Sequence, residues 1–363
     1  MPAVSIMIKP ASMRCNMRCK YCFYHSLSSS RSVADMGLMT RDTAARVISS
    51  ALELADGDSV YFAFQGGEPL IAGKDFFRYF IDKTKELNSK GSVIYYALQT
   101  NGTLVDEEWA DIFKSAGFLI GLSLDGDRDG NIYRMDASYA PVFNEVTATA
   151  DLLTAKGVDF NILTVVTARC AANIERTYRY FKSCGYKYLQ FIPCLRPFGD
   201  DSDSDMYMTV EQYAQYLIRL FNLYVKDYVD GNYVSIRHFD NAVRLFLGGR
   251  PEQCGVGGHC SRQFVIEGNG NVYPCDFYCL DEWLLGNIND TGLKELARCD
   301  KAIKFLTRSL KLPDKCASCP YYRVCRGRGC MRSREDRDYC EAYKSFYSKC
   351  LPLFRAFIGE RNN

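Results

Sequence analysis

The pattern of apolar and polar segments predicts a body of alternating strands and helices. Short runs rich in β-branched and aromatic residues occur at 5–9, 60–65, 93–98, 118–124, 160–166 and 188–192. Between them, apolar residues recur with helical spacing over 41–55, 75–88, 106–116, 141–156 and 174–183. This β-α-β rhythm is typical of a parallel sheet, and nearly continuous apolar strands fit a sheet covered by helices or a barrel lining. Six such units indicate a partial or complete α/β barrel.

The rhythm stops after Pro193 and a different organisation follows. Residues 200–205 are acidic and indicate a solvated linker, because the glycine and closing glutamate of a calcium loop are absent. Helical spacing returns at 209–229, 238–247 and near 340–357, and runs at 263–267 and 272–278 around a Gly/Asn turn predict a β-hairpin. We therefore expect two domains, residues 1–235 and 236–363.

The charge balance narrows the possible partners. The chain has 45 basic and 43 acidic side chains, which argues against coating a nucleic acid or binding a membrane surface through a basic patch. Its first nine residues lack the basic and apolar regions of a signal peptide, and no run reaches the ~18 apolar residues of a membrane span. We expect a cytoplasmic protein, whose clustered thiols indicate metal ligands before disulfides.

The 17 cysteines fall into groups, and their odd number excludes complete internal pairing. Three near the start form the pattern C-x3-C-x2-C: Cys15, Cys19 and Cys22. Such a loop can hold three irons of a [4Fe-4S] cube and leave the fourth iron open for reactive chemistry. The alternative is a closed zinc site completed by His25 or a distant cysteine. The aromatic neighbours Tyr21, Phe23 and Tyr24 favour a shielded redox cluster.

Other polar motifs follow the next predicted strands. Gly66-Gly67-Glu68-Pro69, Gln99-Thr100-Asn101-Gly102 and Asp125-Gly126 each come directly after an apolar run. In parallel α/β folds the reactive groups gather at the carboxyl ends of the strands. A Gly-Gly pair alone usually marks a turn, but after a strand it also permits close approach of the backbone to a ligand.

The segment Cys15-Asn16-Met17-Arg18-Cys19-Lys20-Tyr21-Cys22 resembles the signature of the radical SAM superfamily. The resemblance implies a partial (β/α)6 TIM-like barrel, in which S-adenosylmethionine (SAM) binds the open iron and is cleaved reductively to a 5'-deoxyadenosyl radical. It also implies SAM contacts from five residues: Tyr21, Gly67, Ser123, Arg134 and Leu195. Judged without the resemblance, Ser123 is equally compatible with strand packing, and Arg134 with a surface ion pair.

The C-terminal third contains eleven cysteines, and eight of them have spacing suited to two fully ligated [4Fe-4S] cubes. Two structural zinc sites are the alternative. The pattern resembles the SPASM domain of peptide-modifying radical SAM enzymes, with a last spacer of four residues, 326–329, in place of three. The resemblance implies one cube on Cys254, Cys260, Cys275 and Cys330 and another on Cys316, Cys319, Cys325 and Cys340, hence three [4Fe-4S] clusters in all.

The remaining six cysteines are expected to be buried small hydrophobic residues: Cys170, Cys184, Cys194, Cys279, Cys299 and Cys350.

Asp276 directly follows Cys275 and is flanked by aromatic residues. An aspartate at the end of a hairpin is most often a cap or a surface charge. Beside an anionic thiolate cluster, however, its ionised form would be disfavoured, which suits a general base that works near neutral pH.

Several longer segments together resemble the anaerobic sulfatase-maturating enzymes: residues 8–12, 22–25, 62–69, 98–104 and 273–278. The resemblance implies oxidation of a sulfatase Cys or Ser, within C-x-P-x-R or S-x-P-x-R of an unfolded chain, to Cα-formylglycine. Asp276 would remove the thiol or hydroxyl proton, the auxiliary clusters would accept the remaining electron, and a flavodoxin or ferredoxin would supply reducing electrons. Neither nucleic acid nor membrane is an expected partner.

Two other functions remain open from the sequence. A maturase that forms thioether, epimerised or cyclised residues would keep the same chemistry, although no leader-binding extension precedes Cys15. An iron-sulfur electron carrier or a zinc-stabilised peptide-binding module would not cleave SAM. Release of deoxyadenosine from SAM therefore distinguishes an enzyme from these two non-enzymatic functions.

Overall fold

The computed structural model describes residues 4–200, 204–327 and 330–361. They form two compact units, each built from several segments. The first unit combines residues 1–123, 133–160 and 262–305, and the second combines residues 124–132, 161–261 and 306–363. The expected domain boundary at residue 235 stays a prediction. Residues 201–203 of the acidic linker lie outside the described part.

The strands of the first unit follow the order β10-β9-β8-β1-β2-β3-β4. Four parallel strands confirm predicted runs to within two residues: β1 (Val4–Ile8), β2 (Val60–Phe64), β3 (Ile94–Thr100) and β4 (Phe118–Ser123). The predicted hairpin is also confirmed, as β8 (Phe264–Ile266) and β9 (Asn271–Tyr273), and β10 (Gly286–Asn287) pairs with its outer strand. The sequence did not reveal that β8 pairs in parallel with β1.

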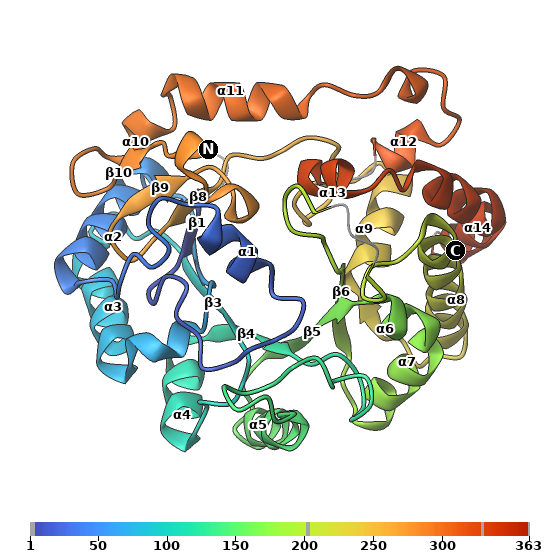
Figure 1. Cartoon of the computed structure of the whole chain (residues 1–363), viewed down its shortest axis with the longest axis horizontal. Coiled ribbons are helices and arrows are strands. Elements are labelled where there is room, and N and C mark those ends of the chain that lie inside the picture. Colours follow the sequence, from blue (N-terminus) through green and yellow to red (C-terminus); the bar gives the residue numbers. More distant parts are fainter. Residues whose placement is uncertain (1–3, 201–203, 328–329, 362–363) are drawn as a thin grey trace. The chain divides into compact units, whose positions relative to one another are not determined.

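Side chains of these strands alternate between two cores. Ile6 and Ile8 belong to a large core with Phe62 and Phe64, whereas Met7 packs against a smaller core on the other face. Figure 1 shows α2 and α3 on one side of β1 and α1 on the other. The helices of this unit are α1 (Phe23–Ser29), α2 (Arg41–Ala55), α3 (Lys74–Leu87), α4 (Glu107–Ala116), α5 (Phe143–Ala155) and α10 (Leu293–Leu296).

Short 3-10 turns complete the first unit, at Pro69–Ala72, Asp276–Tyr278 and Asp281–Trp283. Another helix, α11 (Asp300–Ser309), contains residues assigned to both units.

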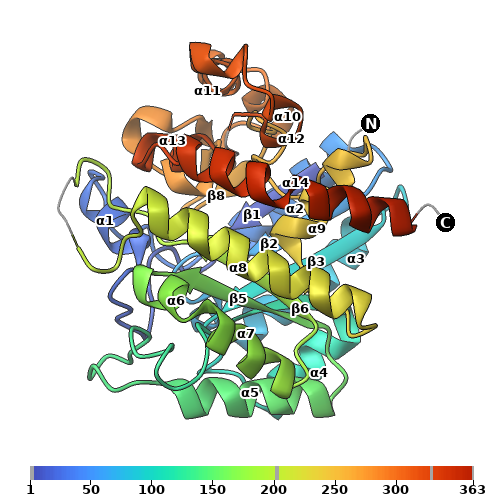
Figure 2. The same cartoon turned by 90° about the vertical axis from the view of Figure 1, so that its right-hand side faces the viewer.

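The second unit contains the parallel strands β5 (Phe160–Val166), β6 (Tyr188–Pro193) and β7 (Ser235–Ile236). Its helices are α6 (Ala168–Ala172), α7 (Ile174–Ser183), α8 (Val210–Val229), α9 (Arg237–Phe246), α12 (Tyr322–Cys325), α13 (Met331–Asp336) and α14 (Cys340–Arg361), with a 3-10 turn at Asp314–Cys316. Figure 2 shows α14 lying beside α8, where the rings of Phe221 and Phe354 stack at 4.2 Å.

Both units are therefore built from parallel strands and the helices that connect them, which confirms the α/β class. None of the helices in the described ranges has the length and apolar character needed to cross a membrane.

Candidate active site

Cys15, Cys19 and Cys22 lie in the loop that joins β1 to α1, and Cys22 caps the helix. Burial, together with the nearby Glu68, Cys19 and Cys22, raises the pKa of the Cys15 thiol to about 12, although a hydrogen bond from the Met17 backbone N–H opposes the shift. The three sulfurs are therefore electrostatic neighbours in a loop that disfavours free thiolates. Metal coordination removes the thiol protons and supplies the compensating positive charge, so this donor set fits an iron-sulfur cluster.

Glu68 follows β2 and forms hydrogen bonds with the end of β3 and with the loops that follow β1 and β3. Its buried carboxylate accepts hydrogen bonds from the Thr100 hydroxyl at 2.9 Å and from the Asn101 backbone N–H at 2.8 Å. Its own backbone N–H donates to the Arg14 carbonyl at 2.8 Å. Burial raises the pKa of Glu68 to about 7, although the hydrogen bonds from Asn101, Leu70 and Thr100 oppose the shift.

Gly67 is in contact with the cysteine loop. It has a φ of +54°, and a Cβ atom here would lie 2.2 Å from the Arg14 carbonyl oxygen. A side chain at this position would push the loop away from the strand end. The glycine therefore provides a close approach of backbone to backbone. The close approach to a ligand that the sequence motif predicts stays a prediction.

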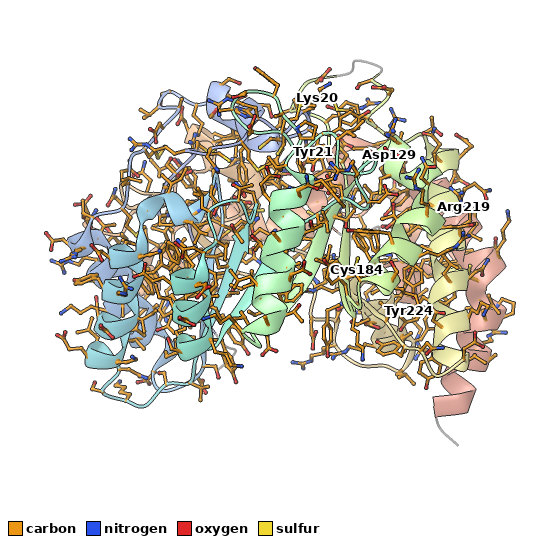
Figure 3. All side chains as sticks on the ribbon, turned by 90° about the horizontal axis from the view of Figure 1, so that it is seen from below. Lys20, Tyr21, Asp129, Cys184, Arg219 and Tyr224 are labelled. Atoms are coloured by element: carbon orange, nitrogen blue, oxygen red, sulfur yellow. The ribbon has the colours of Figure 1, made fainter. Side chains whose placement is uncertain are left out.

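Four of the five residues predicted to contact SAM belong to the first unit. Tyr21 follows Lys20 in the cysteine loop (Figure 3), and the Arg134 guanidinium lies 5.6 Å from the centre of its ring. Arg134 is buried and lowers the pKa of Cys22 against the larger effect of burial, so the surface ion pair considered for it is wrong. Ser123 ends β4 and accepts a hydrogen bond from Gln99 at 2.9 Å.

The fifth residue, Leu195, belongs to the second unit and lies two residues beyond the end of β6. The contacts of these five residues with SAM stay predictions.

The parallel pairing of β8, β1 and β2 places three polar residues side by side at the strand ends. Ile8 pairs with Phe64 on one side and with Ile266 on the other, so the next residues, Lys9, Gln65 and Glu267, share one register position. Backbone hydrogen bonds continue this register, from Lys9 to Ile266 at 2.8 Å and from Gln65 to Ile8 at 3.0 Å. All three point to the face of the smaller core, as Met7 does.

Asp276 lies against this row and is buried, so the surface alternative is wrong for it. The Lys9 ammonium lies 2.8 Å from its Oδ1 atom, and Tyr24 and Gln65 donate hydrogen bonds to its Oδ2 atom at 2.6 and 3.2 Å. The sequence did not indicate that a buried ammonium lies beside this carboxylate. The role of Asp276 as a general base stays a prediction.

From the sequence, Lys9 was included only within residues 8–12, which resemble the family, and was assigned no role. Its place in the strand could have indicated one, because Lys9 lies two residues after Met7 and therefore points to the same face of the sheet.

In the second unit, Cys316, Cys319, Cys325 and Cys340 line one pocket, together with the aromatic side chains of Tyr321, Tyr322, Tyr343 and Tyr347. The resemblance to the SPASM domain implied this set of four as the ligands of one cube, and that assignment stays a prediction. Their convergence on a single space, walled by aromatic rings, fits a shielded cluster.

The other predicted set is drawn from both units. Cys254, Cys260 and Cys330 lie in the second unit, where burial, followed by Cys330 and Cys254, raises the pKa of Cys260 to about 11. Cys275 belongs to the first unit and precedes the turn that contains Asp276. In the four-residue spacer, Arg326 caps the end of α12 in the left-handed conformation and Gly327 also has positive φ; residues 328–329 lie outside the described part.

Four of the six remaining cysteines are buried as expected: Cys170, Cys194, Cys279 and Cys350. The expectation is wrong for Cys184, which is exposed at the end of α7 (Figure 3), and for Cys299, which is partly exposed.

Comparison with known families defines the class of the protein. Residues 10–181 match the Radical SAM superfamily, and residues 254–320 match the SPASM iron-sulfur cluster-binding domain. Fold and site therefore define a radical SAM enzyme with a SPASM domain, a class that binds SAM and a [4Fe-4S] cluster and carries additional iron-sulfur clusters.

Individual relatives narrow this class further. A cysteine-type anaerobic sulfatase-maturating enzyme of Clostridium perfringens is 43% identical over 97% of both chains, and a serine-type enzyme of Bacteroides thetaiotaomicron is 27% identical over 96% of this chain and 89% of its own. A solved structure, native anSMEcpe with bound AdoMet and Cp18Cys peptide, matches with a TM-score of 0.93 and 39% identity over 99% of both chains. The chain belongs to the family of anaerobic sulfatase-maturating enzymes, which confirms the resemblance seen in the sequence.

Proposed function

We propose that this protein oxidises the active-site cysteine of a sulfatase to Cα-formylglycine, within a C-x-P-x-R segment of the unfolded chain. The observation that carries the proposal is the buried Asp276 carboxylate, held by an ion pair and two hydrogen bonds in a chain of this family. Cysteine is favoured over serine because the cysteine-type relative is 43% identical and the serine-type relative 27%.

The residues divide the work as follows. Cys15, Cys19 and Cys22 would hold the cube whose open iron binds SAM. With SAM bound, that cube would supply the electron that cleaves SAM to methionine and a 5'-deoxyadenosyl radical, and the radical would remove a hydrogen atom from the substrate Cβ. Five residues would contact SAM: Tyr21, Gly67, Ser123, Arg134 and Leu195.

Asp276 acts as the general base in this proposal. It would accept the thiol proton through a lone pair that the ion pair and the two hydrogen bonds leave available, since a carboxylate has about four acceptor sites. The loss of a hydrogen atom, a proton and one further electron turns the thiol into a thioaldehyde. Water then converts the thioaldehyde to the aldehyde and releases hydrogen sulfide.

Two cysteine sets would hold the auxiliary cubes that accept the further electron: Cys254, Cys260, Cys275 and Cys330, and Cys316, Cys319, Cys325 and Cys340. A flavodoxin or ferredoxin in the cytoplasm would reduce the first cube. The domain boundary at residue 235 belongs to the same proposal and is supported by the family matches, which end at residue 181 and resume at residue 254.

The test is incubation of the reduced, cluster-loaded enzyme with SAM and two peptides that differ only in Cys or Ser at the target position. We expect the Cys peptide to lose one sulfur and two hydrogens and gain one oxygen, as read by mass spectrometry. Faster loss of two hydrogens from the Ser peptide would contradict the cysteine preference, and no product from either peptide would reject this substrate class.

A further inference from the structure

Lys9 is a fully buried lysine whose side chain runs across the first glycine of the Gly66-Gly67 pair. A Cβ atom on Gly66 would lie 2.7 Å from the Lys9 Cγ atom and 2.9 Å from its Cδ atom. Gly66 also has a φ of +107°, which a residue with a side chain rarely adopts. The end of β2 therefore leaves a path for the lysine.

The path ends at Asp276. The ammonium lies 2.8 Å from Asp276 Oδ1, 3.5 Å from the Cys279 sulfur and 4.7 Å from the centre of the Tyr24 ring. Burial opposes the charge on Lys9, but the neighbouring groups, chiefly Asp276, outweigh it and raise the pKa of the ammonium. Lys9 therefore stays charged beside the carboxylate.

Both oxygens of Asp276 are thus held by different segments. Lys9 at the end of β1 engages Oδ1, whereas Tyr24 of α1 and Gln65 at the end of β2 donate to Oδ2. An ion pair on one oxygen and hydrogen bonds on the other leave the carboxylate plane little freedom to rotate.

Lys9 also forms a longer ion pair with Glu267. Glu267 is fully buried, with its Oε1 atom 3.7 Å from the Lys9 ammonium and 2.6 Å from an Arg31 nitrogen. The set thus contains two cations and two anions, so its charges balance. Burying such charges is costly unless they are paired, and loss of one partner leaves an uncompensated charge.

We propose that Lys9 is a positioning residue for the reaction: it fixes the Asp276 carboxylate in the orientation that proton transfer from the substrate requires. This inference rests on the proposed function. Lys9 itself touches neither substrate nor cofactor in this proposal, and it acts through Asp276.

The experiment compares variants of the cluster-loaded enzyme with SAM, reductant and the Cys peptide. It measures iron content, deoxyadenosine formed, and formylglycine formed per deoxyadenosine. For Lys9→Met we expect wild-type iron and continued deoxyadenosine release, with formylglycine per deoxyadenosine reduced roughly 10- to 100-fold. Lys9→Arg restores the charge and should recover part of this ratio.

The chain offers a matched control in the second unit. There the buried Asp227 accepts a hydrogen bond from Tyr178 at 2.7 Å and pairs with Lys182 at 2.7 Å, the same three residue types as around Asp276. Lys182→Met should lower stability and leave the ratio at the wild-type value, because Asp227 has no part in the reaction.

A wild-type ratio in Lys9→Met would overturn the inference, whatever happens to stability. If Lys9→Met fails to bind iron, the test uses Lys9→Gln, which keeps a hydrogen-bond donor without the charge. The same ratio of formylglycine to deoxyadenosine is then measured for this variant. Asp276→Asn separates the two proposals. If Asp276→Asn abolishes formylglycine and Lys9→Met does not change the ratio, only the inference fails. If the wild-type enzyme makes no formylglycine, the proposed function fails and the inference falls with it.

Discussion

At Gly67 a single hydrogen in place of a side chain decides whether the cysteine loop can meet the end of β2. The Arg14 carbonyl oxygen would lie 2.2 Å from a Cβ atom at this position. Part of the residue-level chemistry was therefore visible in the sequence, because a glycine pair after a strand is a local signal. The partners of Asp276 were not visible, because Lys9 and Tyr24 lie far from it along the chain.

Gly67→Ala tests this contact. Gly117→Ala is the matched control, because Gly117 also has a left-handed backbone, with φ +67°, and no atom within 4 Å of a Cβ there. The backbone strain, about 1–2 kcal/mol, is common to both variants. We expect Gly117→Ala to keep the wild-type iron content and the wild-type affinity for SAM, and Gly67→Ala to bind SAM more weakly. Iron analysis measures the first quantity and equilibrium binding the second. Equal SAM affinity in the two variants would contradict the role of the contact.

At the scale of elements, the loops that follow β1, β2 and β3 form one hydrogen-bonded layer. Glu68 accepts from the loop after β3 and donates to the loop after β1, and the Asn101 side chain donates to Asn16 in the cysteine loop at 2.9 Å. The strands themselves were predictable from apolar periodicity. Their lateral partners were not, since the parallel pairing of β8 with β1 depends on contacts distant in sequence.

Because of Glu68, the free energy of unfolding is expected to depend on pH. Burial raises its pKa from the ordinary 4.5 to about 7, so the folded state binds this proton more tightly than the unfolded chain. The stability that the proton contributes is complete at low pH and is lost as the pH rises through 7. Between pH 6 and pH 8 we expect a loss of roughly 1.4 kcal/mol, which Glu68→Gln should abolish.

The measurement is the denaturant midpoint of wild type and Glu68→Gln at pH 6, 7 and 8. The difference between the two proteins removes the contribution of other titrating groups. A constant difference across this range would show that Glu68 keeps an ordinary pKa.

At the scale of the whole molecule, the cysteines divide into three in the first loop, eight in the two proposed auxiliary sets and six others. Spacing along the chain showed where the thiols cluster, and the resemblance to the SPASM domain implied the division into two auxiliary sets. The structure gathers Cys316, Cys319, Cys325 and Cys340 around one pocket. It also assigns Cys275 to a different unit from Cys254, Cys260 and Cys330, which no spacing rule indicates.

Iron and acid-labile sulfide analysis tests the proposed ligand sets. Three cubes require about twelve irons per chain, and the double variant Cys316→Ala, Cys319→Ala should retain about eight while still cleaving SAM. About four irons with two zinc ions in the wild type would instead indicate two structural zinc sites. Loss of SAM cleavage in the double variant, with eight irons retained, would contradict the separate role of this set.

The sequence by itself determined the order of the main strands and helices and the positions at which the cysteines cluster along the chain. These follow from periodicity and spacing, which are local properties of a chain. Only the tertiary structure decided that β8 lies beside β1 and that Lys9 therefore meets Glu267 and Asp276. The physical reason is that buried charges select partners by distance in the folded state, and separation along the sequence carries no record of that distance.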